Sequence, residues 1–374
     1  MAGRSITFFS AGNGNCCLIM IDDFSIVVDL HGSGDETSWD LIRPYLPVKA
    51  GVRHIDVLCI THGDKDHCGG FEILKKEMDK KRLVIGSIWH PNFDRTKVDS
   101  IADLPDDYKV LHSEIMRRHE VEDPQYGDIE QPLTAWDTER IAFAGFETVP
   151  QNLSLHVLSP YLKDDEEGEF DINDMCLVLN LEISGLRVLF PGDSGSAIWS
   201  DRIFAHTLDS DDKSDWGQAD VLVASHHGSY KFFGSDREEV LNADPEPENY
   251  QALDSIGFSD LVVSSASRFP TSGDESGDDP PHYAAWKWYH KWVQDNRGVG
   301  EDDKHPSCFK YTADGHLRLE YGDEGWVWRT DWSPDDDGGS SDDSAPSEAG
   351  KAGLTAIGFK YREGKTRRGP GHYA

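Results

Sequence analysis

Two histidines and two aspartates lie within six residues of one another, directly after an apolar segment. They belong to the sequence Thr61-His62-Gly63-Asp64-Lys65-Asp66-His67. Imidazole nitrogens and carboxylate oxygens are ligands that suit zinc, manganese or iron. Side chains alternate along an extended segment, so residues 62, 64 and 66 point to one side, and residue 67 reaches a neighbouring position as a helix begins. The segment predicts a metal site, with a polar loop that binds no ion as the alternative.

Strand-like segments precede and follow this loop and must position it. The first ninety residues alternate short apolar runs with turns, which predicts an N-terminal β-meander and further strands. The turn Gly12-Asn13-Gly14-Asn15 separates the first two strands. The predicted strands are Ile6 to Phe9, Cys16 to Ile21, Ile26 to Leu30, Ile55 to Ile60 and Leu83 to Trp89, and the predicted helix is Phe71 to Lys81.

The second half repeats this mixture, so the chain is expected to have an α/β fold. Helices are predicted around Ile198 to Ala205 and from Tyr283 to Val293. A hairpin is predicted for residues 309–312 and 317–321, across an Asp-Gly turn. The other predicted strands are Leu153 to Leu158, Cys176 to Ile183, Val188 to Phe190, Val221 to Ala224, Leu261 to Ser265 and Trp326 to Arg329.

Changes in composition predict the domain organisation. Residues 1–332 form the expected main domain, and the polar residues 91–150, with one helix near Tyr108 to Glu120, are the natural place for a substrate-shaping insertion. Residues 333–353 contain almost no large apolar side chains, which predicts a disordered linker. Residues 354–374 are basic, which indicates a frayed end, a protein-docking peptide or a nucleic-acid contact.

Composition also excludes several functional classes. The 374 residues carry a formal net charge of −33, so the average surface repels phosphate backbones and does not coat DNA nonspecifically. No segment approaches the ~20 consecutive apolar residues of a membrane span, so a cytoplasmic protein without a membrane partner is expected. The six cysteines include no C-x-x-C pair and several lie in apolar runs, which argues against a disulfide framework.

The loop at residues 62–67 resembles the signature of the metallo-β-lactamase superfamily: histidine, any residue, histidine or aspartate, any residue, aspartate, histidine. Aspartate in the second place, here Asp64, is the informative variant of this signature. With it the chain resembles the hydrolase domain of the ComEC-type competence proteins, which import DNA, and related standalone hydrolases. The resemblance extends over residues 3–330 and implies an αββα sandwich. Those competence proteins have a membrane channel, so DNA import is not implied for this chain.

The resemblance implies two divalent metals, zinc or manganese, and a role for each ligand. His62 and Asp64 would hold the first metal, Asp66 and His67 the second, with Asp193 between them and His227 completing a shell. Asp29 matches a buried aspartate that supports the metal loop, residues 61–67, in relatives. One member of the pair His226-His227 is expected to bind metal, and the other to face the substrate as an acid or oxyanion contact. His227 is favoured as the ligand, although either order is chemically sensible.

The chain departs from the superfamily pattern in two places, one at a metal ligand and one at the substrate side of the site. A further histidine, usually supplied by a Pro-Gly-His segment, is missing, so Asn173 and Asp174 are the candidates to replace it or to hold its water. One metal position is therefore expected to be weaker. His282 is a second candidate for protonating the leaving group, with an exposed histidine that caps a helix start as the alternative. Arg268 is a candidate contact for a substrate phosphate, with a surface arginine that balances nearby aspartates as the alternative.

Water activated between two metals, with Asp66 as a catalytic ligand, suits phosphodiester hydrolysis. The resemblance therefore implies a phosphodiesterase or nuclease that acts on nucleic acid or nucleotides. Several standalone relatives look like components of prokaryotic defence loci, so an antiviral effector role belongs to this hypothesis. The alternatives are an acyl hydrolase of a lactam, lactone or thioester, and a partner-regulated subunit whose metal site is structural or conditionally active.

Overall fold

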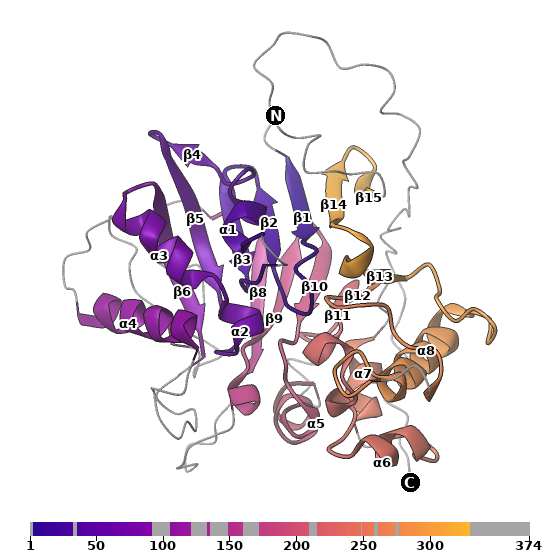
Figure 1. Cartoon of the computed structure of the whole chain (residues 1–374). Helices are drawn as coiled ribbons and strands as arrows, with labels where there is room; N and C mark the ends of the chain where they lie inside the picture. The colour runs from indigo at the N-terminus through magenta and orange to yellow at the C-terminus, as the bar shows by residue number, and fades with distance from the viewer. Residues whose placement is uncertain are drawn as a thin grey trace.

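Two mixed β-sheets lie at the centre of the protein in its computed structural model (Figure 1). The structure describes residues 3–32, 36–91, 105–120, 133–134, 149–159, 172–208, 215–247, 249–257, 261–273 and 277–329. The predictions for residues 333–353 and 354–374, and for most of 91–150, lie outside these residues. No helix within the described ranges combines the length and the apolarity that crossing a membrane requires.

The first sheet leads into the metal loop and has nine strands among the described residues. β1, β2 and β3 form the predicted antiparallel meander, while β3, β5, β6 and β7 run parallel. The carboxyl ends of β3 and β5 therefore lie at the same sheet edge. In spatial order the strands are β15 (Gly325–Arg329), β14 (Leu317–Gly322), β1 (Arg4–Phe8), β2 (Cys17–Ile21), β3 (Phe24–Val28), β5 (Val52–Cys59), β6 (Leu83–His90) and β7 (Leu133–Thr134), with β4 (Val48–Lys49) beside β5.

The second sheet leads into the pair His226-His227, which we call the double histidine. It has six strands in the described part of the chain. β8, β9 and β10 are antiparallel, and β10, β11, β12 and β13 are parallel. The loops after β10, β11 and β12 thus emerge at one edge. In spatial order the strands are β13 (Phe309–Tyr311), β12 (Leu261–Ser264), β11 (Val221–Val223), β10 (Leu186–Phe190), β9 (Val178–Ile183) and β8 (Leu153–Ser159).

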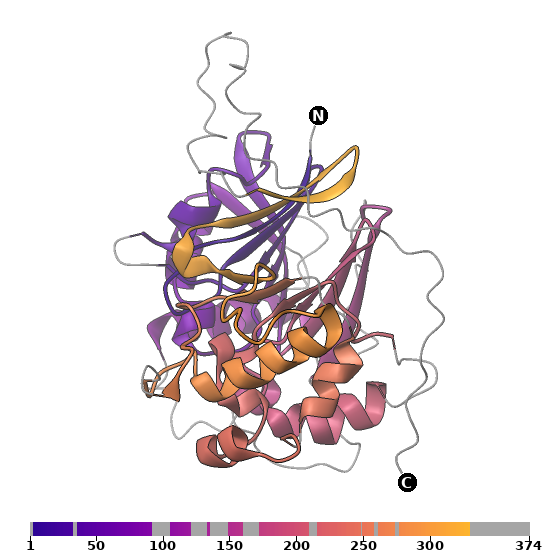
Figure 2. The same ribbon diagram turned by 90° about the vertical axis from the view of Figure 1, so that its right-hand side faces the viewer.

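An apolar core fills the space between the sheets, because the side chains on both inner faces are mainly aliphatic. Ile19, Ile26, Leu181 and Val188 are fully buried there. Helices α1–α4 cover the outer face of the first sheet and α5–α8 that of the second (Figures 1 and 2), each over its own apolar cluster. The helices are α1 (Ser38–Ile42), α2 (Lys65–Cys68), α3 (Phe71–Asp79), α4 (Asp106–Glu120), α5 (Ser196–Ile198), the π-helix η4 (Trp199–Leu208), α6 (Arg237–Asn242), α7 (Tyr250–Ile256) and α8 (Tyr283–Arg297). The predicted αββα sandwich is confirmed.

The predicted hairpin across residues 313–316 is wrong. β13 pairs with β12 in the second sheet, whereas β14 pairs with β1 and β15 in the first. A 3-10 turn, Thr312–Asp314, and Gly315 with a φ of 129° connect the two strands. The chain therefore crosses from one sheet to the other here, and the closing hairpin is made by β14 and β15.

Candidate metal centre

The metal loop, residues 61–67, begins near the end of β5 and is held by an aspartate from the neighbouring strand. Asp29 directly follows β3, and its Oδ1 accepts a hydrogen bond of 2.7 Å from the Thr61 backbone N–H. Its Oδ2 lies 2.8 Å from His67 Nδ1. A hydrogen bond at Nδ1 fixes the imidazole ring so that Nε2 faces the site. Asp29 is only 1% exposed and has the supporting position that the resemblance implies for it.

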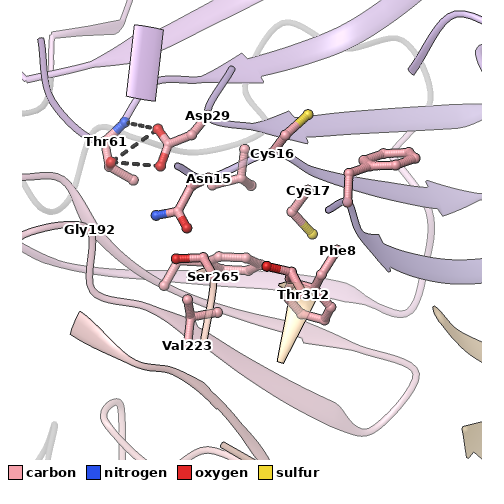
Figure 3. Close-up of a pocket in the computed structure, with 13 residues that line it drawn as sticks. Phe8, Asn15, Cys16, Cys17, Asp29, Thr61, Gly192, Val223, Ser265 and Thr312 are labelled. Atoms are coloured by element: carbon pink, nitrogen blue, oxygen red, sulfur yellow. Dashed lines mark hydrogen bonds between the residues drawn. The ribbon is translucent and has the colours of Figure 1, made fainter. Parts of the chain in front are cut away.

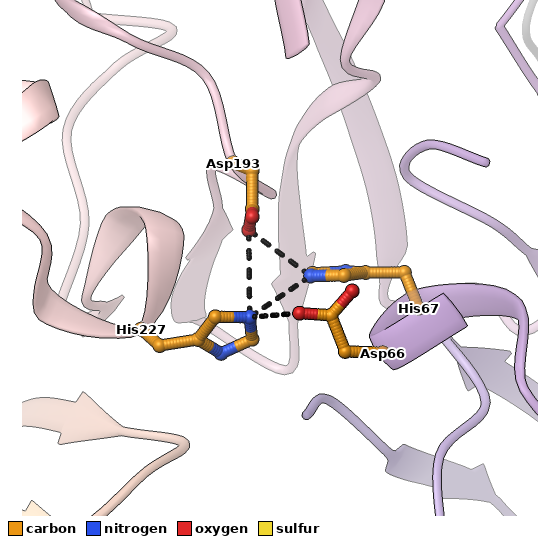
Figure 4. Close-up of side chains that lie close together, drawn as sticks. All are labelled: Asp66, His67, Asp193 and His227. Carbon is orange, nitrogen blue, oxygen red and sulfur yellow. Dashed lines mark hydrogen bonds and ion pairs between the residues drawn. The ribbon is translucent and has the colours of Figure 1, made fainter. Parts of the chain in front are cut away.

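Asp193, from the loop after β10, lies between two sets of histidines. Its Oδ1 is 3.0 Å from His67 Nε2 and 3.7 Å from His227 Nε2 (Figure 4). Its Oδ2 is 3.6 Å from His62 Nε2 and 3.5 Å from His226 Nε2. The two oxygens of one buried carboxylate therefore face different histidines, which is the arrangement of a ligand shared by two metals.

The double histidine lies on a turn with an uncommon backbone. His226, His227 and Gly228 have φ values of 48°, 55° and 85°. Consecutive non-glycine residues in the left-handed region cost free energy and persist where surrounding contacts hold them. The turn buries His227, whose Nε2 lies 3.0 Å from Asp66 Oδ2, and leaves the His226 side chain 16% exposed. This geometry favours His227 as the ligand and His226 as the substrate contact.

Both central carboxylates are ionised at neutral pH. Burial raises the pKa of Asp193, but the surrounding histidines, led by His67, outweigh burial and hold that pKa well below its usual value. Burial also raises the pKa of Asp66, but its hydrogen bond with His227 and the positive charges of His67 and His227 together outweigh burial and bring the pKa to about 2. Metal ligands must be deprotonated, so both carboxylates are available to a cation at neutral pH.

The donor atoms fit a pair of divalent cations. Asp66, His67, Asp193 and His227 offer four ligand atoms that lie within 4.8 Å of one another. His62, Asp64 and Asp66 offer a second group of three atoms within the same distance. His67 Nε2 and His227 Nε2 face each other at 3.2 Å (Figure 4), an approach that a proton or a cation must compensate. His62 Nε2 is buried without a hydrogen-bond partner among the described residues, which is costly unless something binds it.

The two groups differ in how completely the protein encloses them. We call the group of Asp66, His67, Asp193 and His227 the inner position, and the pair His62 and Asp64 the outer position. The histidines of both positions are buried, and the difference lies in the aspartates: the Asp66 side chain is 34% exposed and the Asp64 side chain 45%. The outer position is therefore the more open of the two.

The two candidates for the missing ligand of the outer position remain predictions. Asn173 lies in a segment next to the metal loop, because the Leu177 backbone N–H donates a hydrogen bond of 2.7 Å to the Thr61 carbonyl. Asn173 Oδ1 is buried without a hydrogen-bond partner among the described residues. No contact among the described residues joins it to His62 or Asp64, and the Asp174 side chain is not among those that the structure describes.

Two other predicted site residues contact other parts of the protein. His282 is buried, unlike the exposed cap of the alternative, whereas Arg268 forms the surface ion pair of the alternative. His282 is 3% exposed at the N-terminus of α8; its Nε2 lies 2.9 Å from the Asp278 carbonyl, and its Nδ1 accepts a 3.4 Å hydrogen bond from the Tyr230 backbone N–H. Both ring nitrogens thus contact the backbone, which is a structural role at a helix start. Arg268 pairs with Asp314 at 3.0 Å on the rim of an open pocket of about 430 Å³, as expected for a surface arginine that balances an aspartate.

Two residues absent from the sequence-based predictions contact the candidate metal ligands His67 and His227. Thr61 Oγ1 lies 2.8 Å from Asp29 Oδ2 and 3.1 Å from His67 Nδ1. Ser265 directly follows β12, and its Oγ lies 2.8 Å from His227 Nδ1. Neither residue belongs to a sequence signature. Ser265 reaches the site because neighbouring parallel strands end at one sheet edge and β12 is the neighbour of β11 in the structure.

A small cavity lies behind the cluster, between the two sheets (Figure 3). Its volume is about 20 Å³, which is room for one water molecule. Asn15, Asp29, Thr61, Ser265 and Thr312 contribute polar groups to its wall. The residues that support the histidines thus meet in a space shielded from bulk solvent.

Gly192 is needed where the turn before Asp193 approaches the metal loop. Its φ is 56°, and a Cβ there would lie 3.0 Å from the Thr61 Cβ. We expect Gly192→Ala to lower the free energy of unfolding by about 1–3 kcal/mol. Urea denaturation of the protein in the presence of a metal chelator measures this change. Gly195→Ala is the control, because Gly195 has a φ of −90° and its nearest neighbour would be 3.5 Å away. Equal stability of the two variants would contradict this explanation.

Comparisons with known proteins agree with this geometry. Residues 10–149 match the family model described as the Metallo-beta-lactamase superfamily. A segment of 203 residues is 29% identical to ComE operon protein 3 of Bacillus subtilis (strain 168). That match covers 54% of this chain and 20% of the relative, so the chain spans about a fifth of that protein's length. These matches confirm the resemblance and the fold class predicted from the sequence.

Solved structures with similar folds were also found. The metallo-beta-lactamase fold protein YhfI from Bacillus subtilis matches 85% of this chain and 99% of its own, at 11% identity and a TM-score of 0.43. CmlA, a diiron beta-hydroxylase from Streptomyces venezuelae, matches 86% of this chain and 55% of its own, at 15% identity and a TM-score of 0.43. Igni18, a metallo hydrolase from Ignicoccus hospitalis, matches 85% of this chain and 100% of its own, at 13% identity and a TM-score of 0.37.

Proposed function

Starting from a metallo-β-lactamase fold in which two sheets bring potential metal ligands together, we propose that this protein is a metal-dependent phosphodiesterase of nucleic acid or nucleotides. One observation carries the proposal: Oδ1 and Oδ2 of Asp193 face different groups of donors. Two divalent ions, zinc or manganese, would lower the pKa of bound water and stabilise both the attacking and the leaving oxygen of a phosphodiester.

The side chains divide this work between them. Asp66, His67 and His227 hold the inner position, His62 and Asp64 hold the outer position, and Asp193 serves both. His226 remains free of the inner group, with a partly exposed ring and its Nε2 3.5 Å from Asp193 Oδ2. It is therefore placed to donate a hydrogen bond to an oxygen of the substrate.

Lys231 supports an anionic substrate. It follows the double histidine by four residues and is exposed, and its positive charge adds to the effect of burial in lowering the pKa of His226. No carboxylate among the described residues forms an ion pair with Lys231, although the chain has a net charge of −33. An unpaired cation beside the metal centre offers phosphate a local attraction that the acidic surface otherwise denies.

Hydrolysis assays with metal-free and reloaded protein test the proposal. We expect chelator treatment to abolish cleavage of DNA, RNA or cyclic dinucleotides, and zinc or manganese to restore it. His67→Ala is expected to stay inactive in both states, because it removes a ligand of the inner position. Chromogenic lactam and thioester substrates are the counter-test, since cleavage of these alone would support an acyl hydrolase. Metal-loaded protein that cleaves no phosphodiester would falsify the proposal.

A further inference from the structure

The two sheets support their metal-binding histidines in the same way. In the first sheet β5 leads into the metal loop, and its parallel neighbour β3 is followed by Asp29, which lies 2.8 Å from His67 Nδ1. In the second sheet β11 leads into the double histidine, and its parallel neighbour β12 is followed by Ser265, which lies 2.8 Å from His227 Nδ1. The same structural position thus supplies the partner of each Nδ1.

From this repetition we infer that Ser265 is a positioning residue of the inner position: its hydroxyl keeps the proton of His227 on Nδ1 and leaves Nε2 free to bind a metal. The inference rests on the proposed metal site. His227 and Ser265 are 2% and 5% exposed, so bulk water has little access to this hydrogen bond. The opposite ring nitrogen, His227 Nε2, faces Asp66 at 3.0 Å and His67 at 3.2 Å.

The backbone of the double-histidine turn makes this support necessary. His227 has a φ of 55°, and the residues on both sides of it also have positive φ values, so the turn alone holds the ring poorly. The hydrogen bond to Ser265 connects this turn to the end of β12, which is fully buried. Without the hydroxyl, Nδ1 would be buried without a partner, and the ring would rotate or change tautomer.

The chemical difference between Asp29 and Ser265 also has a reason. The cluster already contains the carboxylates of Asp64, Asp66 and Asp193 in addition to Asp29. A neutral hydroxyl accepts a hydrogen bond from Nδ1–H without adding a further negative charge to this group. Ser265 therefore directs His227 while leaving the charge of the site unchanged.

Zinc titration of the full chain after chelator treatment tests the inference. We expect Ser265→Ala to weaken the tighter zinc site by about 10–100-fold, the range found when a hydrogen-bond partner of a ligand is removed. Ser264→Ala is the matched control, because Ser264 is adjacent and fully buried, and its Oγ lies 3.4 Å from the Ser267 carbonyl. Its zinc affinity is expected to equal that of the unmodified protein.

A second pair of variants separates the hydroxyl from packing. Threonine and valine have nearly the same shape, so Ser265→Thr should bind zinc more tightly than Ser265→Val by the same factor of about 10–100. In the NMR spectrum of the zinc-loaded protein, a slowly exchanging Nδ1 proton of His227 should be present with the native serine and lost in Ser265→Ala. The same proton should persist in Ser265→Thr, because that variant keeps the hydroxyl.

Three outcomes would overturn the inference: unchanged zinc affinity in Ser265→Ala, equal losses in Ser264→Ala and Ser265→Ala, or equal affinities in Ser265→Thr and Ser265→Val. Thermal unfolding of the metal-free variants shows whether a loss of affinity reflects a loss of folding. Zinc binding is measured without substrate, so it is independent of the proposed function. A protein that binds zinc as expected but cleaves no phosphodiester would contradict the function and leave the role of Ser265 intact.

Discussion

Asp193→Asn is expected to lower kcat/KM for phosphodiester hydrolysis by about 10³-fold or more, which corresponds to about 4 kcal/mol of transition-state stabilisation. The amide has nearly the shape of the carboxylate but lacks its charge, and its nitrogen is a poor metal ligand. Since Oδ1 and Oδ2 face different histidines, one substitution weakens both metal positions. Elemental analysis should therefore show less metal bound, alongside the kinetic loss.

Asp201→Asn is the control for this substitution. Asp201 is an exposed aspartate of η4 in the same half of the chain, so its loss of charge should change neither metal content nor rate. If Asp193→Asn kept its full metal content and a rate within about tenfold of the unmodified protein, the shared-ligand role of Asp193 would be wrong.

His226→Ala is expected to lower kcat by about 10²–10³-fold, the usual effect of removing one hydrogen-bond donor to a developing oxyanion. Metal content should stay unchanged, because His226 lies outside the inner position. Burial lowers the pKa of His226 to about 4, so the ring is neutral at pH 7 and suits hydrogen bonding better than proton transfer. His226→Gln keeps a donor and should recover part of the lost rate.

The two variants of His226 distinguish its possible roles. Equal losses in His226→Ala and His226→Gln would indicate that the ring transfers a proton to the leaving group. Loss of metal in either variant would make His226 a ligand and contradict the order favoured for the double histidine. His282→Gln is a useful comparison, because both ring nitrogens of His282 contact the backbone and its loss should affect folding more than turnover.

The sequence made the metal loop recognisable as a candidate site because four potential donors lie within six residues. His62, Asp64, Asp66 and His67 follow a strand directly, and their spacing resembles a known signature. Ser265 and Thr61 have no such signature, since isolated hydroxyl residues occur throughout the chain. Their contacts depend on which strands are neighbours, and strand order follows from the packing of the whole domain.

The hairpin error has the same origin. An Asp-Gly turn between two short apolar segments is a strong local signal for a hairpin, and this signal led to the wrong prediction. In the structure β13 gains its partner from β12 and β14 gains its partner from β1, at the opposite end of the described chain. Pairing with these distant strands overrides the local preference, whereas the meander of β1–β3 relies on neighbours in sequence and was predicted correctly.

The division of the ligands between the two sheets makes any bound metal a cross-link within the chain. His67 and His227 are separated by 160 residues, and their Nε2 atoms lie 3.2 Å apart. In the chain-entropy model, closing a loop of this length disfavours the unfolded state by about 5 kcal/mol. All six cysteines are buried and unpaired, so no disulfide supplies this constraint. The metal centre would thus do for this chain what disulfides do for secreted proteins, and it would hold the two sheets together only as long as cations are available.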